Sequence, residues 1–151
     1  MTQPFTEEEL KSNDPPRFTE TRRVRFQDVD AAGIIFYPRV LEYFSDAYMA
    51  WMHEAGIDIP RTLELGEIGF PLVHAEADYL RPLRFGDVIA VEIASAKVGE
   101  TSFTIGYRIR TGTGRLASIG QTAHVCIDRA TFRACPIPDE LLSLLTGSDR
   151  G

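Results

Sequence analysis

Two aspartates and a glycine stand directly before the strongest helical pattern of the chain, and their types could carry chemistry. Asp28, Asp30 and Gly33 lie in the stretch RFQDVDAAGIIFYPRV, and the helical pattern begins at Pro38. A carboxylate can attack a carbonyl carbon or deprotonate a water molecule. The first N–H groups of a helix lack intrahelical acceptors and can stabilise a developing oxyanion. The spacing therefore permits acyl transfer, although an aspartate at such a place more often caps a turn or the helix.

The two carboxylates differ in their position relative to the helix. Asp30 lies closer to the helix start, whereas Asp28 lies closer to the preceding strand and is interpreted as a residue that anchors the loop. Gly33 has no side chain and would let a substrate approach closely. We expect no metal here, because no pair of candidate ligands has the helical or hairpin spacing of metal sites.

The helix that follows must lie in the core of the fold. Pro38 is typical of a first helical position and Gly56 of the residue just past the end. About 18 residues of helix span about 27 Å, close to the width of a small domain. Apolar residues recur along one helical face at the spacing i, i+3, i+4, i+7, namely Leu41, Phe44, Ala47, Tyr48, Trp51, Met52 and Ala55.

The remaining chain has the pattern of antiparallel strands. A half-buried strand is predicted around Val24 and Phe26, and four more are predicted over 70–80, 88–98, 101–111 and 116–128, separated by short glycine-containing turns. In the segment 101–111 apolar and polar residues alternate, so we expect only one of its faces to be deeply buried. Short helices are predicted from about 58 to 66 and from 139 to 145.

These elements predict an α+β fold in which a curled antiparallel sheet of about five strands wraps around the long helix. We expect one domain over 19–146, with flexible tails at 1–18 and 147–151. Thr6 and Glu9 fit a capping box, but the first tail offers little apolar surface for docking. A sheet that covers one helix leaves an edge and part of its outer face unprotected, so we predict at least a homodimer.

Composition excludes several classes of protein. The net charge of −6 argues against nonspecific binding to nucleic acid, which needs clustered basic residues. The chain has no apolar run long enough to span a membrane and a polar amino terminus, so we expect a cytoplasmic protein. Cys126 and Cys135 have no CxxC spacing, and we interpret them as reduced structural thiols.

Three stretches together resemble one known family. DVDAAGIIFYPRVLEYFSDA, FPLVHAEADYLRPLRFGD and TAHVCID are similar to the hot-dog-fold acyl-CoA thioesterases of the 4-hydroxybenzoyl-CoA thioesterase family, and within it to the 1,4-dihydroxy-2-naphthoyl-CoA thioesterases. The resemblance covers about 19–138. It implies a hot-dog fold, hydrolysis of an acyl-CoA without a cofactor, and self-association as a dimer or tetramer.

The resemblance also implies roles for individual residues. Asp30 matches the catalytic carboxylate of the family, and the backbone amide of Tyr37 matches its oxyanion donor. Whether Asp30 acts as a nucleophile or as a general base stays open. Four further positions match places in the family that face the substrate, and each could also be an ordinary surface or strand residue: Ser45, Asp46, Thr101 and Ser102. Gly33 is a substrate-facing candidate because it has no side chain. His74 shares a strand face with Glu76 and Asp78, which could form a pocket wall or a polar face exposed to solvent. For His74 and His124 a structural role is favoured.

Coenzyme A carries phosphates that need positively charged partners. The bacterial hydroxybenzoyl type of the family has a basic run in the hairpin before the third strand. This run is replaced here by KVGET, in which only Lys97 is basic. Lys97 and Arg84 are therefore the candidate phosphate contacts, with Arg81, Arg108, Arg110 and Arg133 as alternatives. This departure weighs against the hydroxybenzoyl enzyme itself.

The sequence thus predicts a thioesterase that acts on an aromatic acyl-CoA such as 1,4-dihydroxy-2-naphthoyl-CoA or a 4-hydroxybenzoyl-CoA-like compound. A short- or medium-chain fatty acyl-CoA or acyl-carrier-protein thioesterase is the alternative within the same chemistry. A non-catalytic acyl-CoA binding module is the alternative from another class, and Asp30 argues against it, because a pure binder needs no carboxylate beside the thioester.

Overall fold

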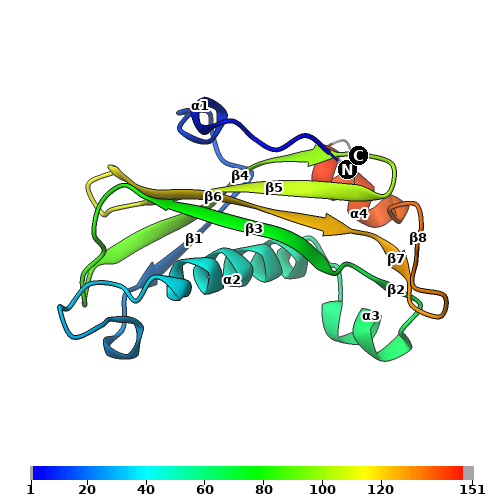
Figure 1. Cartoon of the computed structure of the whole chain (residues 1–151), viewed down its shortest axis with the longest axis horizontal. Coiled ribbons are helices and arrows are strands. Elements are labelled where there is room, and N and C mark those ends of the chain that lie inside the picture. Colours follow the sequence, from blue (N-terminus) through cyan, green and yellow to red (C-terminus); the bar gives the residue numbers. More distant parts are fainter. Residues whose placement is uncertain (1, 148–151) are drawn as a thin grey trace.

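A long helix lies in the concave face of a five-stranded antiparallel sheet (Figure 1). The computed structural model describes residues 2–147, so the predicted carboxy-terminal tail lies outside the described residues beyond Gly147. The helix is α2, Pro38–Glu54. The strands follow the order β1-β4-β5-β6-β3, with bounds β1 Phe18–Arg23, β3 Leu72–Tyr79, β4 Val88–Val98, β5 Ser102–Arg110 and β6 Leu116–Val125. The predicted α+β architecture is confirmed.

Helix α2 packs closely on the middle of the sheet. The ring of Phe44 stacks on Tyr107 with centroids 4.5 Å apart. A Cβ atom at Gly120 would lie 2.4 Å from both the Phe44 ring and the Glu76 carbonyl oxygen. Only glycine therefore fits at this point of β6, where α2 packs on the face of the sheet and the edge strand β3 lies alongside.

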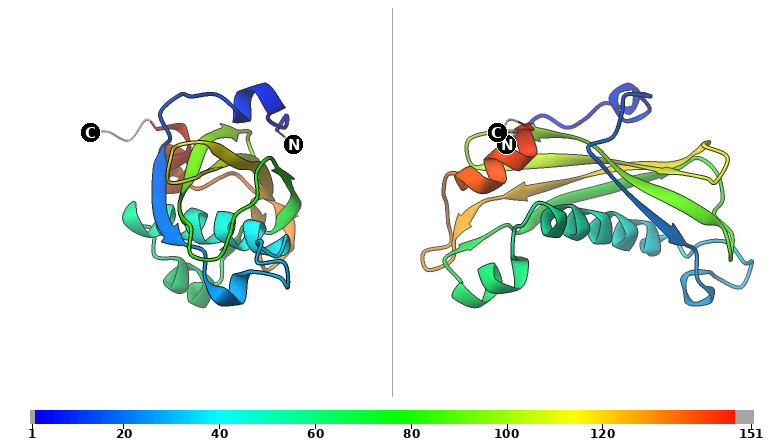
Figure 2. Two further views of the ribbon diagram at one scale, coloured as in Figure 1. Left: turned by 90° about the vertical axis from the view of Figure 1, so that its left-hand side faces the viewer. Right: turned by 180° about the vertical axis from the view of Figure 1, so that it is seen from behind.

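A second, smaller sheet closes the carboxy-terminal end of α2 (Figure 2). It has the order β2-β7-β8, with β2 Ile68–Gly69, β7 Ile127–Asp128 and β8 Arg133–Ala134. The predicted strand 116–128 is thus divided, because β6 ends at Val125 and β7 joins the second sheet. The short helices α3 (Ile59–Leu65) and α4 (Asp139–Thr146) flank this end.

The prediction of a strand around Val24 and Phe26 is wrong in its position. Strand β1 ends at Arg23, and Phe26–Asp28 form a 3-10 turn, η1, in which Phe26 is 75% exposed. The cause lies in Asp28, whose carboxylate accepts a hydrogen bond from the Arg25 N–H at 3.1 Å. This bond turns the chain where the alternation of Val24 and Phe26 suggested an extended strand.

Residues 2–17, called here the N-terminal strap, lie on the face of the sheet opposite α2 (Figure 2). The strap contains helix α1, Glu7–Leu10, with the predicted capping box of Thr6 and Glu9. Phe5 and Leu10 are buried against Ile119, contrary to the expectation that this segment has little apolar surface for docking. Two side chains suffice because the backbone is held as well.

The side-chain amide of Gln121 accepts from the Phe5 N–H at 2.7 Å and donates to the Phe5 carbonyl at 3.1 Å. The strap also buries the outer face of β5. Arg108 is 1% exposed, pairs with Glu92 at 2.9 Å and donates to the carbonyl oxygens of Ser12 and Asp14. The prediction that β5 buries only one face is therefore wrong, because a segment distant in sequence covers the other.

Candidate active site

The two aspartates lie on a tight loop that leads into α2. The Phe36 N–H donates to the Asp28 carbonyl at 2.8 Å, and the Asp30 N–H donates to the Ile34 carbonyl at 2.9 Å. The loop therefore folds back on itself, with Asp30 to Ile34 as its tip. Gly33 has φ +77°, a left-handed conformation that favours glycine.

The Asp30 side chain is exposed at this tip. Its Oδ1 atom accepts from the Ala32 N–H at 2.9 Å and from the Ile34 N–H at 3.4 Å. Within the part of the chain that the structure describes, Oδ2 has no hydrogen-bond partner. The carboxylate opens into a hollow whose apolar walls include Phe26 and Phe85, with ring centroids 5.7 Å apart. One oxygen is thus held in place while the other is free for a substrate.

Asp28 is fully buried and anchors the loop to the helix. Its carboxylate accepts from the Tyr43 hydroxyl at 2.7 Å and from the Arg25 backbone N–H at 3.1 Å, and the Arg25 guanidinium lies 3.3 Å away. Burial alone would raise the pKa of Asp28, but the hydrogen bonds from Arg25 and Tyr43 outweigh it and hold the pKa below its usual value. Asp28 is therefore ionised at neutral pH, and its interpretation as a loop anchor is confirmed.

The start of α2 faces solvent beside this loop. Tyr37 is the N-cap residue, and its carbonyl oxygen accepts from the Tyr79 hydroxyl at 2.8 Å. Among residues 2–147 no acceptor is found for the Tyr37 N–H, as is usual for the first amides of a helix. A free amide at a helix start is suited to bind an anionic oxygen.

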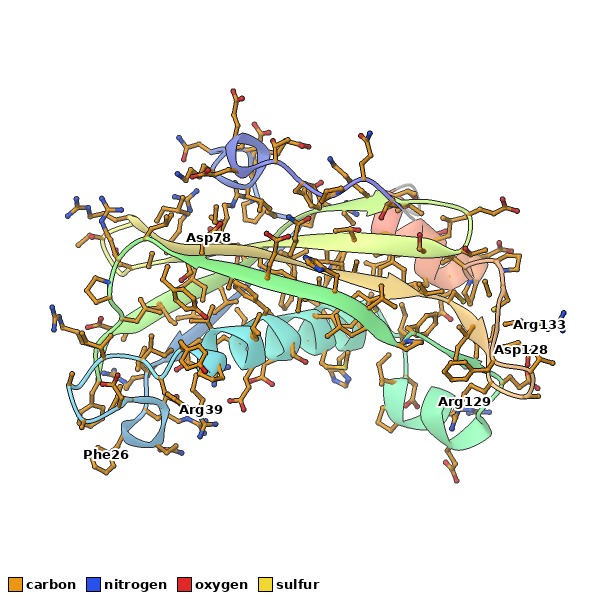
Figure 3. All side chains as sticks on the ribbon, in the orientation of Figure 1. Phe26, Arg39, Asp78, Asp128, Arg129 and Arg133 are labelled. Atoms are coloured by element: carbon orange, nitrogen blue, oxygen red, sulfur yellow. The ribbon has the colours of Figure 1, made fainter. Side chains whose placement is uncertain are left out.

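Three arginines lie around the start of α2, namely Arg25, Arg39 and Arg84. Only Arg84 was predicted from the sequence as a site residue. Arg84 is exposed and its backbone pairs with Ile34 at the loop tip. The Arg39 guanidinium lies 3.8 Å from Asp28 and 2.7 Å from Glu42. Phe26 and Arg39 lie together at this end of the molecule, opposite Asp128 and Arg133 (Figure 3). Two features of the sequence could have indicated the missed arginines. Arg25 lies three residues before Asp28, and Arg39 directly follows Pro38.

The other predicted residues on α2 and β3 do not contact the Asp30 loop in the described structure. Ser45 and Asp46 are exposed, and Asp46 pairs with Arg22 at 2.8 Å. His74 is exposed on the edge strand β3, with its ring nitrogen 2.9 Å from Glu76. These residues therefore reach a substrate only from the side of α2 and β3 that is open to solvent.

Thr101, Ser102 and Lys97 lie at the opposite end of the sheet. Ser102 is buried, and the Thr101 carbonyl accepts from the Cys126 N–H at 2.7 Å. The Lys97 ammonium is bonded to the Pro4 carbonyl and to Glu9 of the strap, each at 3.1 Å. Within one copy of the chain, the structure does not bring these three residues to Asp30.

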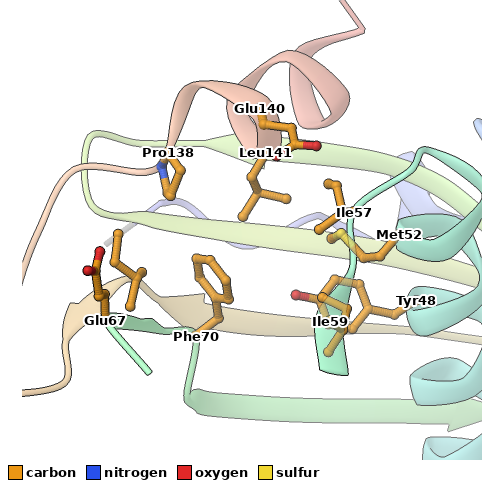
Figure 4. A pocket seen from close by; sticks show the side chains of 10 residues that line it. Tyr48, Met52, Ile57, Ile59, Glu67, Phe70, Pro138, Glu140 and Leu141 are labelled. Atoms are coloured by element: carbon orange, nitrogen blue, oxygen red, sulfur yellow. The ribbon is translucent and has the colours of Figure 1, made fainter. Parts of the chain in front are cut away.

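An apolar cavity that is partly open to solvent lies at the carboxy-terminal end of α2, and sequence reasoning missed it (Figure 4). It has a volume of about 340 Å³. Its walls come from four separate segments of the chain, so no pattern within a single segment predicts the cavity. The lining residues are Tyr48, Met52, Ile57, Ile59, Glu67, Ile68, Phe70, Pro138, Glu140 and Leu141.

Neither a metal centre nor a membrane helix is found in the described part of the chain. Residues 2–147 contain no group of three or more His, Cys, Asp or Glu side chains that could hold a metal ion. No helix among them is long and apolar enough to cross a membrane.

Comparison with known proteins gives a consistent result. The family model described as "Thioesterase-like superfamily" matches residues 24–145. The 1,4-dihydroxy-2-naphthoyl-CoA hydrolase of Nostoc punctiforme is 34% identical over 133 residues, which cover 88% of this chain and 89% of that protein. The hydrolase of the same name from Synechococcus elongatus (strain ATCC 33912 / PCC 7942 / FACHB-805) is 33% identical over 121 residues, which cover 80% of this chain and 88% of that protein.

Solved structures agree with these relatives. Slr0204, a 1,4-dihydroxy-2-naphthoyl-CoA thioesterase from Synechocystis, matches with a TM-score of 0.83 and 26% identity over 89% of this chain and 98% of that one. BH1999 gentisyl-coenzyme A thioesterase matches with a TM-score of 0.74 and 28% identity over 82% of this chain and 98% of that one. The fold is the hot-dog fold that the sequence predicted.

Proposed function

Because this chain belongs to the thioesterase-like superfamily, we propose that it hydrolyses the thioester of an aromatic acyl-CoA to the free acid and CoA. The observation that carries the proposal is the exposed Asp30 carboxylate, which opens into a hollow beside the start of α2. The names of the relatives, which act on dihydroxynaphthoyl-CoA and gentisyl-CoA, support an aromatic acyl group. We propose 1,4-dihydroxy-2-naphthoyl-CoA or a 4-hydroxybenzoyl-CoA-like compound as the substrate.

In the proposed reaction the thioester carbonyl oxygen faces the start of α2. The Tyr37 N–H donates to this oxygen as negative charge builds on it, and the positive end of the helix dipole adds to the stabilisation. Asp30 either attacks the carbonyl carbon to give an anhydride, which water then hydrolyses, or takes a proton from the attacking water. In both routes the carbon–sulfur bond breaks and CoA leaves as a thiolate, which then takes up a proton.

The neighbouring residues have supporting roles in this proposal. Gly33 leaves room for the thioester at the loop tip. Arg84 remains the proposed contact for a CoA phosphate, and Arg39 and Arg25 add positive charge at the same end of α2. Lys97 remains a predicted phosphate contact. Its bonds to the strap do not favour this role, because they already engage the ammonium group.

We further propose that two copies pair through the edge strand β3, antiparallel to each other. This edge leaves backbone groups unpaired and exposes apolar side chains, including Leu72 at 54% and Val73 at 49%. The Tyr79 end of β3 lies at the start of α2, as its bond to Tyr37 shows. Antiparallel pairing would bring His74 of one copy toward the Asp30 end of the other, so the proposed substrate contacts His74, Ser45 and Asp46 would belong to a shared site. Thr101 and Ser102 lie at the Leu72 end of the sheet, so the same pairing would also bring their end of one copy toward the Asp30 end of the other.

Association is tested by sedimentation velocity across a range of protein concentrations. Val73→Lys should weaken the dimer, because it places a charge on the pairing edge. Val88→Lys is the matched control, since Val88 is similarly exposed at 42% but lies on β4. A wild-type chain that sediments as a monomer at every concentration would contradict the proposed pairing.

The function is tested by measuring release of free thiol from a panel of aryl-CoA and alkyl-CoA substrates. We expect turnover of the aryl-CoA compounds, with the alkyl compounds slower. Preference for short or medium alkyl chains would replace the aromatic substrate by a fatty acyl one. Tight binding of acyl-CoA without thiol release from any compound would instead identify a binding module.

A further inference from the structure

We propose that Cys126 and Cys135 form a modification site, in which an intramolecular disulfide forms by exchange with a low-molecular-weight disulfide such as oxidised glutathione. Both cysteines are free thiols in the structure. Their interpretation as separate structural thiols rested on their spacing in sequence. The fold brings them together across a hairpin that the sequence did not reveal.

The backbone places the two cysteines opposite each other. Strands β7 and β8 pair antiparallel, with Ile127 opposite Ala134 and Asp128 opposite Arg133. The next pair outward is Cys126 with Cys135, and the Cys135 N–H donates to the Cys126 carbonyl at 3.0 Å. Directly opposed residues in such a pair have Cα atoms about 4.5 to 5.5 Å apart, within the range that a disulfide needs.

The side chains point toward each other. The two Sγ atoms are 3.4 Å apart, and the Cys126 thiol also donates to the Pro136 carbonyl at 3.5 Å. A disulfide bond is about 2.0 Å long, so the sulfur atoms have only a little over 1 Å to close. Side-chain rotation can supply this distance without moving the hairpin.

The two thiols differ in access, and this sets the order of the reaction. Cys126 is fully buried, whereas Cys135 is partly exposed. Burial and the neighbouring Cys135 sulfur raise the pKa of the Cys126 thiol to about 12, so Cys126 is protonated at neutral pH. Cys135 is therefore the sulfur that meets an external disulfide first, and Cys126 is the thiol that resolves the product.

The exchange balances in two steps. The Cys135 thiolate attacks one sulfur of oxidised glutathione, forms a mixed disulfide and releases one glutathione thiol. Cys126 then loses its proton and attacks the Cys135 sulfur, which releases the second glutathione thiol. The protein loses two protons and two electrons, and the oxidised glutathione takes them up as two glutathione thiols.

The bond would tie together the segments that close the carboxy-terminal end of α2. Cys126 joins β6 to β7, and β7 pairs with β2, which leads to Phe70 at the cavity. Cys135 leads through two prolines into α4, which supplies Leu141 to the cavity wall. Closing a short loop restricts the unfolded chain, so the oxidised protein should unfold at a temperature roughly 5 °C higher or more.

The test treats the whole protein with oxidised glutathione, blocks remaining thiols with iodoacetamide under denaturing conditions and measures the intact mass. We expect the wild-type chain to lose two hydrogen atoms and to carry neither glutathione nor alkyl groups. Cys126→Ser should keep one glutathione on Cys135, because the resolving thiol is gone. Cys135→Ser should gain no glutathione, since Cys126 is buried in the folded protein, and should carry one alkyl group after the denaturing block.

Two results would overturn the proposal. One is a wild-type chain that keeps both thiols under conditions in which Cys126→Ser gains glutathione, and the other is a wild-type chain that stops at the mixed disulfide. Differential scanning fluorimetry of oxidised and reduced protein gives an independent readout, with the Cys126→Ser/Cys135→Ser double variant as the unresponsive control. Neither measurement involves thioester hydrolysis, so both stand whatever the substrate panel shows.

Discussion

The two ends of α2 are covered in opposite ways. At its start, a polar loop exposes Asp30 and leaves the Tyr37 amide without an acceptor among the described residues. At its other end, α3, α4 and the small sheet border an apolar cavity beside Met52 that is partly open to solvent. Charge and hydrogen-bonding capacity open to solvent suit chemistry, whereas buried apolar side chains contribute to stability. Substitutions at the two ends should therefore change different measurable quantities.

The largest effect is expected for Asp30→Asn. Removing a nucleophile or general base should lower turnover by roughly a thousandfold, while the unfolding temperature changes little because the side chain is exposed. Steady-state thiol release and thermal unfolding measure the two quantities. Asp139→Asn is the matched control, since it makes the same chemical change on an exposed residue of α4 and should leave turnover unaltered. Turnover near the wild-type level in Asp30→Asn would remove Asp30 from the mechanism.

Asp28→Asn should affect both activity and stability. The substitution leaves Arg25 and Tyr43 without their buried carboxylate, which should lower the free energy of unfolding by about 3 kcal/mol. It should also lower turnover roughly tenfold to a hundredfold, because the loop that carries Asp30 loses its anchor. Chemical denaturation and kinetics measure the two effects, and Tyr43→Phe should lose only about 1 to 2 kcal/mol.

Because the pKa of Asp28 is shifted, the stability that this residue contributes depends on pH. Its pKa is lower in the folded chain than in the unfolded one, so its stabilisation is present above about pH 4 and is lost as the pH falls through the folded value. Asp28→Asn should therefore differ most from the wild type at neutral pH and least in strong acid. A constant difference in stability from pH 7 down to pH 2 would contradict this account.

Met52→Ala should affect stability alone. Met52 is 1% exposed and lines the cavity, so its truncation should lower the free energy of unfolding by about 2 to 4 kcal/mol. Turnover per folded molecule should stay close to wild type, because the change lies at the end of α2 away from Asp30. Met49→Ala, on the exposed side of the same helix, is the control. A selective loss of activity toward aromatic substrates would instead show that the cavity takes part in binding them.

The smallest effect concerns His124, which lies between Tyr48 and Phe103. Burial lowers the pKa of His124, although a hydrogen bond to the Phe70 carbonyl opposes the shift. The unfolded chain therefore takes up a proton first as the pH falls below about 6.5, and stability decreases by at most about 1.4 kcal/mol per pH unit. Denaturation at pH 7 and pH 5.5 should show this loss, and His124→Phe should reduce it. An equal loss in both proteins would assign it to other groups.

Local patterns predicted the central elements of the fold, because the apolar pattern and the turn residues of each element lie within a single segment of the sequence. The start of α2 at Pro38 and the full extent of β4, 88–98, agree with the structure. The loop motif and the start of the helix likewise allowed Asp30, Gly33 and Tyr37 to be grouped from the sequence.

Features that depend on distant segments could not be predicted in this way. The face of β5 that carries Arg108 looks solvent-exposed in the sequence, because its cover comes from the strap. The cavity and the pairing of Cys126 with Cys135 similarly need several segments to meet. Ser45 and Asp46 were grouped with Asp30 by family resemblance and His74 by its polar strand face, and within one copy the described structure shows no contact between them and the loop.

The strap also sets an order of events during folding. The Phe5 backbone is held by Gln121, a residue 116 positions later in the chain. The surface that receives Phe5 and Leu10 is complete only when β5 and β6 have paired, so the strap cannot dock before them. Contacts of such long sequence separation form late and slow the overall rate. The strap thus reaches its native place only after strands that follow it by about a hundred residues have paired.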